Sequence, residues 1–424
     1  DDGQTISASP EGLLLSQQLF AALDSDAQLR AGAYPANVRG PDRAELPSAT
    51  LEDLESAVAR AAAEHNATIF IYGLVIPQQS GQALELHFFI RDPSFSFGSE
   101  VAGATRMGRP VPFSLPLDDL TLTAANAPLK ARITALQRIV SGLKNYSIGE
   151  LDEAAAAFRD ALLIPDWAAD QGKEVAYMLL GAALLSGDSA QTHPSERLHN
   201  LQSAGAAFAQ ARDLAPDYAR SYLGLGLVTI QSADASLRRH STEDLAAYPA
   251  LLDEAREMFT QARNAREQPE MAFVAIKCSY GLGMAHVIGA NGKLPGWSYD
   301  EAQVAFEQVV AGYVSTGSPD LLALAGYAHI FLGETAGKRE QWALMITEMH
   351  SGIDLLESIP FRPPRARIAA YWTRVGYAQE QAGRLNEALA AYDQALTRGQ
   401  GVVLQKDIDY WIQERERIAS GMSQ

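Results

Sequence analysis

The amino-acid sequence predicts a mostly α-helical protein, an α-solenoid of about six helix pairs preceded by a small α/β domain with an antiparallel sheet. Runs rich in β-branched and aromatic residues, typical of strands, occur only before residue 129. After that point apolar residues follow helical spacing, and small and aromatic residues recur at matching places. The 424 residues exceed the roughly 250 to 300 at which a single core stops growing, which favours a stacked array behind a separate domain.

Two helices are expected at the amino end. The first covers residues 10–24, where Ser9 can cap the helix and Pro10 suits its first turn. Thr50 is expected to cap the second, which places Val58 on its apolar side.

Strands are expected next. Thr68–Ile76 and Leu84–Arg91 form a predicted hairpin, and a third strand is expected near Glu100–Arg106. The proline-rich residues 109–119 are expected to carry the chain out of the sheet, because proline cannot donate to a strand ladder.

The clearest repeat lies near the carboxyl end. Its small and large residues fall at regular offsets: Trp372, Val375, Gly376, Gly383, Ala388, Tyr392 and Ala395. Glycine and alanine let two helices approach closely, and the aromatic side chain fills the space toward the next repeat. This spacing predicts a helix pair.

Earlier segments repeat the scheme, which gives about six helix pairs. The marker residues are Gly142 with Phe158, Ala204 with Phe208, Gly226 with Phe259 after an insertion at 231–248, Ala302 with Phe306, and Ala325 with Gly326. Residues 404–420 are expected to form a terminal capping helix. The expected domains are therefore residues 1–125, small and acidic, and residues 126–424, the repeat array with its cap.

These residues identify a resemblance to the tetratricopeptide repeat (TPR) family over the carboxyl two-thirds of the chain. The amino-terminal part resembles the small α/β domain that precedes such repeats in bacterial envelope and signalling proteins, on the evidence of Glu11-Gly12, Glu64-His65-Asn66 and the strand Thr68–Ile76. Such domains usually have a strand before the first helix, and none is evident here. Together with the start at Asp1 rather than methionine, this leads us to expect a piece of a longer protein.

The resemblance implies a concave groove lined by the first helix of each pair. The expected groove residues are Ile139, Leu143, Tyr146, Met178, Leu185, Leu223, Leu227, Ile230, Tyr327, Ile330 and Tyr377. They are apolar or aromatic, so the expected ligand is an apolar or amphipathic segment of a partner protein or of a second copy. The other interpretation is that the chain covers its own groove.

The charge excludes several partners. The net charge is -17, and residues 1–125 carry 16 acidic and 7 basic side chains, so 7 − 16 = -9 of it lies there. A negative chain repels phosphate backbones and anionic lipid surfaces, so nucleic acid is not an expected partner. No run of 18 apolar residues predicts a membrane span.

Chemical motifs are weak. Cys278 is the single cysteine, expected to be a buried structural thiol, and no two histidines stand four residues apart on one helical face. Gly333 to Lys338 resembles a phosphate loop but is one residue short. No catalytic residue, metal site or cofactor is therefore expected.

The sequence thus predicts a non-catalytic scaffold or adaptor that binds a partner through its repeats. One alternative is a regulatory or sensor part of a larger bacterial signalling or defence protein, with an effector or anchor upstream of Asp1. Another is an enzyme with a cleft near Arg91, Arg106 or Arg109. The compartment stays open between the bacterial cytoplasm and the cell envelope.

Overall fold

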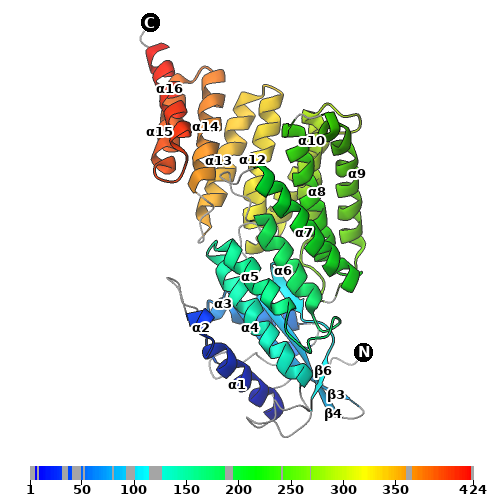
Figure 1. The fold of residues 1–424 in the computed structure, drawn as a ribbon. Coiled ribbons are helices and arrows are strands. Elements are labelled where there is room, and N and C mark those ends of the chain that lie inside the picture. The colour runs from blue at the N-terminus through cyan, green and yellow to red at the C-terminus, as the bar shows by residue number, and fades with distance from the viewer. Residues whose placement is uncertain are drawn as a thin grey trace. The chain divides into compact units, whose positions relative to one another are not determined.

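The structure is a computed structural model of the chain (Figure 1). It describes residues 1–424 apart from 1–4, 7–8, 31–36, 41–48, 51–52, 79–80, 92–100, 114–126, 187–193, 240–241, 268, 360–364 and 422–424.

The amino end confirms one expected helix and corrects the second. Helix α1 (Pro10–Asp24) begins as expected, with the Gly12 N–H donating to Ser9 Oγ at 3.0 Å. Thr50 is not a helix cap. It lies in strand β2 (Ala49–Thr50), and the second long helix, α3 (Leu54–Glu64), begins four residues later.

A strand does precede the first helix, contrary to the expectation. Strand β1 (Thr5–Ile6) pairs antiparallel with β2, with Thr5 opposite Thr50. Two residues are too few to show the alternating pattern that marks a strand in a sequence, and their ladder partner lies more than forty residues away. A single turn-sized helix, α2 (Ala27–Arg30), lies between them.

The predicted hairpin is confirmed as β3 (Ile69–Gln78) and β4 (Gly81–Ile90), and the third strand as β5 (Gly103–Arg106). The proline-rich stretch was interpreted wrongly, because it returns to β4 as a fourth strand, β6 (Val111–Phe113). Pro112 is tolerated there because β6 is an edge strand, where a missing donor can face away from the ladder.

The sheet buries both faces, because successive side chains of a strand point to opposite sides. One face contributes Leu86, Phe88 and Ile90 to a core shared with the first helix pairs of the array. The other face contributes Phe70 and Phe89, and it packs against α3. The sheet is therefore an inner layer between α3 and the repeats.

Within the described residues, the repeat array has the six expected pairs and a terminal helix (Figure 1). In chain order, pair 1 is α4 (Ala127–Ser147) and α5 (Leu151–Leu162), pair 2 is α6 (Lys173–Ser186) and α7 (Pro194–Leu214), pair 3 is α8 (Ala219–Arg239) and α9 (Thr242–Asn264), pair 4 is α10 (Val274–Asn291) and α11 (Tyr299–Thr316), pair 5 is α12 (Leu322–Lys338) and α13 (Trp342–Ser358), pair 6 is α14 (Arg365–Gln381) and α15 (Leu385–Gly399), and the terminal helix is α16 (Gln405–Gly421).

The glycine-to-aromatic contact predicted from the repeat spacing is present. A Cβ atom at Gly376 would lie 2.8 Å from the Tyr392 ring, and one at Gly226 would lie 2.6 Å from the Phe259 ring. Such distances leave no room for a side chain, so glycine is required for the two helices to approach this closely.

The insertion at 231–248 lengthens the two helices of pair 3, because α8 runs to Arg239 and α9 begins at Thr242. The register of pair 5 differs from the expectation. In pair 5 the glycine that corresponds to Gly376 is Gly333, which faces Met349 of the second helix. Gly333 and Met349 are 349 − 333 = 16 residues apart, the same separation as Gly376 and Tyr392. The register of α12 therefore shifts by seven residues from the one based on Gly326.

The chain divides into two compact units, which are described separately below. Unit 1 comprises residues 1–235 and 257–274, and unit 2 comprises residues 236–256 and 275–424. This division runs through α8 and α9 and keeps the sheet with the first helix pairs. The domain limit at residues 125 and 126 remains a prediction.

Candidate functional site

The predicted groove residues of pairs 1 and 2 lie in the core of unit 1. Ile139 and Met178 are 0% exposed and Leu143 is 1% exposed, and they share one hydrophobic cluster with Phe88 and Ile90 of the sheet. The chain's own β-sheet thus packs against these predicted groove positions.

The remaining groove residues of these pairs are also buried. Tyr146 and Leu185 are 7% and 6% exposed. The Tyr146 hydroxyl forms a 2.7 Å hydrogen bond with Ser186 Oγ, which joins α4 to α6. In pair 3, Leu223 and Ile230 are buried at 1% and 0% exposure, whereas Leu227 is half-buried.

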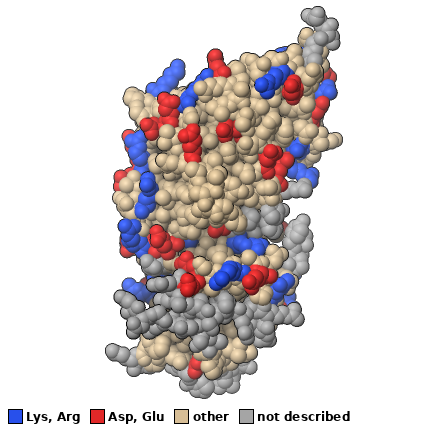
Figure 2. Space-filling model, turned by 180° about the vertical axis from the view of Figure 1, so that it is seen from behind, with Lys and Arg blue, Asp and Glu red and all other residues tan. Residues whose placement is uncertain are grey.

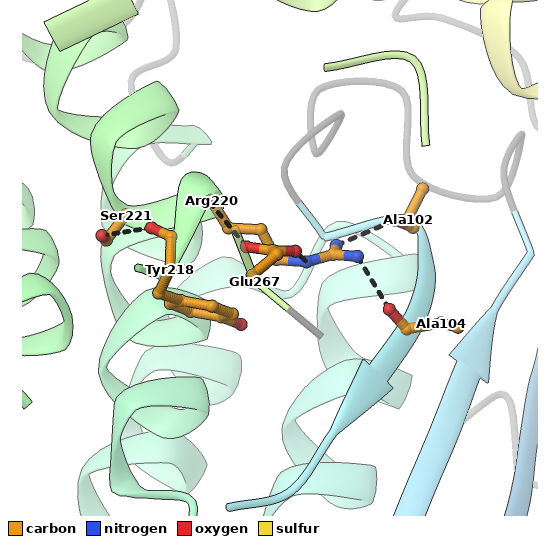
Figure 3. A network of polar contacts seen from close by, with 6 residues as sticks. All are labelled: Ala102, Ala104, Tyr218, Arg220, Ser221 and Glu267. Carbon is orange, nitrogen blue, oxygen red and sulfur yellow. Dashed lines mark hydrogen bonds and ion pairs between the residues drawn. The ribbon is translucent and has the colours of Figure 1, made fainter. Parts of the chain in front are cut away.

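A charged network in unit 1 ties pair 3 to the sheet (Figure 3). Arg220 Nη1 donates to the Ala102 carbonyl at 2.9 Å, and Nη2 donates to the Ala104 carbonyl at 2.8 Å. Its Nε donates to Glu267 Oε1 at 3.0 Å, and both side chains are almost completely buried, at 1% and 6% exposure. The Arg220 backbone N–H also donates to Glu267 Oε2, at 3.2 Å.

The network satisfies a buried charge at the place where β5 begins. Figure 3 shows the Arg220 side chain extended from α8 toward Ala102 and Ala104. Gly103 between them has φ +95°, a conformation that glycine adopts readily, and this turns both carbonyls toward the guanidinium. A buried ion pair in which all three guanidinium nitrogens donate hydrogen bonds is a positioning device that holds the sheet edge in one place.

Sequence reasoning missed Arg220. It stands at the same repeat position as Leu136 in pair 1 and Val175 in pair 2, counted six residues before Gly226, Gly142 and Gly181. A charged residue at a position that is apolar in pairs 1 and 2 was the available signal.

Tyr218 lies beside this network (Figure 3). Among the residues that the structure describes, none makes a hydrogen bond to the Tyr218 hydroxyl. Burial raises the pKa of Tyr218 well above its ordinary value, and the neighbouring Arg220 charge opposes the shift. The hydroxyl is therefore neutral at physiological pH and unsuited to act as a base.

The three arginines considered for a cleft in the α/β domain do not converge. Arg91 donates to Asn66 Oδ1 at 2.8 Å, Arg106 lies 4.0 Å from Glu85, and Arg109 lies 3.7 Å from Asp170. Each has its own partner, so they do not form a shared anion site.

Beside Arg106 lies a small polar cluster on β3 and β4. The His87 ring stacks on Tyr72 with centroids 5.0 Å apart, and His87 Nε2 lies 2.7 Å from Glu85 Oε1. The hydrogen bond from His87 lowers the pKa of Glu85, against the effect of burial. This cluster stabilises a cross-strand contact.

In unit 2, pair 6 presents a predicted groove residue to solvent. Tyr377 is 47% exposed, and its ring meets Trp342 edge-on with centroids 5.8 Å apart. Arg374, one turn earlier on α14, forms an ion pair with Glu334, and Glu380, one turn later, accepts two hydrogen bonds from Arg417 at 2.8 and 2.7 Å. Tyr377 is thus an aromatic side chain with ion pairs on either side.

The other predicted groove residues of unit 2 are buried. Tyr327 and Ile330 are 6% and 1% exposed, within the cluster that joins α12, α13 and α14. Burial raises the pKa of Tyr327, and the charge and hydrogen bond of Arg367 oppose that shift.

A cleft of about 350 Å³ lies on the second-helix side of unit 2. Its walls come from α11 and α13, with Glu307, Val314 and Leu344 among the lining residues, and α12 contributes Leu332 and His329. The sequence interpretation considered only the first helices and did not anticipate this cleft.

Charge and metal-binding groups are dispersed. Figure 2 shows acidic and basic side chains intermingled on the face drawn, with broad areas that carry neither. Within the described residues, no three His, Cys, Asp or Glu side chains gather closely enough to hold a metal ion, and no helix is long and apolar enough to cross a membrane. Cys278 is buried, as expected.

Consecutive helix pairs, each closely packed where a glycine of the first helix faces a large side chain of the second, define a tetratricopeptide-like α-solenoid. No protein-family model matches the chain, and no curated protein sequence matches it. Among solved structures it is similar to TTC0263, a thermophilic TPR protein of Thermus thermophilus, at 16% identity and a TM-score of 0.31 over 68% of this chain and 100% of that one.

Two further solved structures are similar over comparable lengths. Cut9-Hcn1, an APC/C hetero-tetramer, matches at 14% identity and a TM-score of 0.21, covering 68% of this chain and 74% of that one. Yeast Tom70 matches at 11% identity and a TM-score of 0.27, covering 75% and 68%. These likenesses concern the fold, and the function proposed next depends on the contacts of this chain.

Proposed function

We propose that the protein is a non-catalytic scaffold that binds an apolar or amphipathic segment of a partner protein through the concave side of its last helix pairs. The observation that carries this proposal is the 47% exposure of Tyr377, at a groove position of pair 6. The ten other predicted groove residues are buried or half-buried, so a partner could contact most of them only by displacing the core. Tyr377 is accessible without such a rearrangement.

The surroundings of Tyr377 have the composition of a binding hot spot. Tyrosine, tryptophan and arginine are the residue types that most often dominate interface energetics, and a polar rim around an aromatic centre excludes water. Trp342 holds the Tyr377 ring from the side, and the Arg374 and Glu380 ion pairs flank it. Because Tyr377 is held by its neighbour, little conformational entropy is lost when it contacts a partner.

The chain's polar groups support a non-catalytic role. A catalytic site brings a nucleophile, an acid or base, and charge-stabilising donors together. The arginines of the α/β domain instead bind separate partners: Arg91, Arg106 and Arg109. Arg220 and Glu267 form an ion pair with each other, and Arg220 also donates to carbonyls of the sheet.

The test is a pull-down from lysate of the source organism with the full chain, the Tyr377→Ala variant and the Tyr410→Ala control. Tyr410 is 57% exposed on α16 and lies outside the groove positions, so it matches Tyr377 in chemistry and exposure. We expect Tyr377→Ala to reduce a specific partner about tenfold or more, as a hot-spot residue does, and Tyr410→Ala to leave it unchanged. Equal retention by all three proteins contradicts the proposal.

A further inference from the structure

Helix α11 has a second apolar side that its own pair does not use. It buries Ala302, Phe306 and Val309 in the core. Val310 and Val314 lie on another side, and Val314 is 74% exposed. Exposing a large apolar side chain next to a concave surface is unfavourable unless something covers it.

Across the cleft, α13 offers a matching surface. Leu344 is 41% exposed, and Glu348 lies one turn further along the same helix. Leu332 of α12 is buried in the floor between the two walls. A volume of about 350 Å³ is at the lower end of the roughly 300 to 1,000 Å³ of ligand sites, which suits a few side chains of a partner.

The walls are acidic. Helices α11 and α13 carry six carboxylates and no Lys or Arg: Asp300, Glu301, Glu307, Glu348, Asp354 and Glu357. Two of these are paired with cations from other helices or loops, Asp300 with Arg339 and Glu357 with Arg398.

The two carboxylates in the cleft have weaker partners. Glu307 accepts a hydrogen bond from the neutral Gln303 amide at 2.7 Å, and Glu348 lies 2.6 Å from His329 Nδ1. Within the described part of the chain, no Lys or Arg lies within ion-pair distance of either carboxylate. The cleft therefore combines an apolar interior with negative charge on both walls.

We propose that this cleft docks a short segment of a partner protein that carries an apolar side chain next to a Lys or Arg. The apolar side chain packs between Val314 and Leu344, and the cation lies between Glu307 and Glu348. Complementary charge selects a basic segment over an acidic one, and apolar burial provides affinity. The inference rests on the proposed scaffold function and adds a second surface, on the second helices of pairs 4 and 5, apart from Tyr377.

The test uses a display library of random 12-residue peptides selected against the full chain. The cleft variant combines Glu307→Lys with Val314→Ser. The control variant combines Asp354→Lys with Val304→Ser, which makes the same kinds of change on the same two helices but outside the cleft. Asp354 is exposed and Val304 is 50% exposed. Thermal melting of both variants verifies that each is folded.

We expect enriched peptides to contain a Lys or Arg within four residues of a large apolar residue. Their affinity should fall at least tenfold with the cleft variant and stay within twofold with the control variant. Peptides that bind all three proteins equally would overturn the cleft proposal while leaving the scaffold function standing. Enriched peptides that lack basic residues, or the absence of any enrichment, would also overturn it.

A second copy of the chain is the competing occupant. Analytical ultracentrifugation of the same three proteins decides this: dimerisation lost only in the cleft variant assigns the surface to self-association and overturns the peptide proposal. A monomer in all three proteins, together with cleft-dependent peptide binding, is the expected result.

Discussion

Pair 1 of unit 1 and pair 6 of unit 2 present the same repeat positions in different states. Leu143 of pair 1 is 1% exposed, whereas Tyr377, at the same position of pair 6, is 47% exposed. The β-sheet supplies Phe88 and Ile90 against the first. Tyr377 instead has Trp342 edge-on against its ring and ion pairs on either side of it.

The difference teaches that a repeat position determines the direction of a side chain and not its exposure. Apolar surface is buried against whatever apolar surface the chain offers nearby. Unit 1 contains a sheet with two apolar faces, so its groove positions become core. The comparison also predicts which substitutions should affect stability and which should affect binding.

The largest effect is expected at the Arg220 network. Arg220→Met removes a buried cation and leaves Glu267 Oε1 and two carbonyls without the guanidinium donors. Breaking one partner of a buried ion pair costs about 3 to 5 kcal/mol. Urea denaturation measures the loss. Arg212→Met is the control, because its pair with Asp213 is exposed and such pairs contribute about 0 to 1 kcal/mol. Equal effects of the two substitutions would show that the network is not structural.

The next largest loss of stability is expected at a buried groove position of pair 1, Ile139, and it contrasts with the loss at the exposed Tyr377. Ile139→Ala should lower the free energy of unfolding by about 2 to 5 kcal/mol, as truncating a buried aliphatic side chain does. Tyr377→Ala should lower the free energy of unfolding much less, because nearly half of the Tyr377 residue is already exposed to water. Chemical denaturation of both variants tests this, and similar losses would remove the distinction between the two regions.

A smaller effect is expected from overpacking in pair 6. Gly376→Leu inserts a side chain where even a Cβ atom lies 2.8 Å from the Tyr392 ring. Overpacking of this kind costs about 1 to 3 kcal/mol. The melting temperature of the variant reports it, and the stability loss of the Gly376→Leu/Tyr392→Ala double variant should be smaller than the sum of the two single losses, because the two residues are in contact. An unchanged melting temperature of the single variant would mean that the two helices do not pack this closely.

The smallest effect concerns pH and unit 1. Because the pKa of Glu85 is lowered in the folded state, its ionised form stabilises the fold above its ordinary pKa of 4.5, and that contribution disappears as pH falls through the lowered value. Glu85→Gln should lower the free energy of unfolding by about 1 kcal/mol at pH 7, where a charge-assisted hydrogen bond to His87 is lost, and by less as the pH falls through the lowered pKa of Glu85. Glu153→Gln on the exposed side of α5 serves as the control. A pH-independent loss would exclude an electrostatic cause.

Local patterns accounted for most elements. Ser9 and Pro10 located the start of α1, runs of β-branched and aromatic residues located the β3–β4 hairpin, and the glycine-to-aromatic spacing located pair 6. They failed where the deciding contact is distant in sequence. Strands β1 and β6 depend on ladder partners elsewhere in the chain, and they contain too few residues to show a period.

The candidate sites were less predictable than the fold. Val314, Leu344 and Glu348 come from two helices, and their shared cleft exists only once α11 and α13 lie on either side of α12. Tyr377 was named from its repeat position, but that position gave the same expectation for Leu143, which is buried.

By itself, the sequence determined that the chain is a helical repeat array of six pairs behind a small sheet, because periodicity and close-packing glycines are local properties. The tertiary structure decided which groove positions are core and which remain available. It did so because the exposure of a side chain depends on what packs over it, and the segments that bury Ile139 and surround Arg220 lie far from them along the chain.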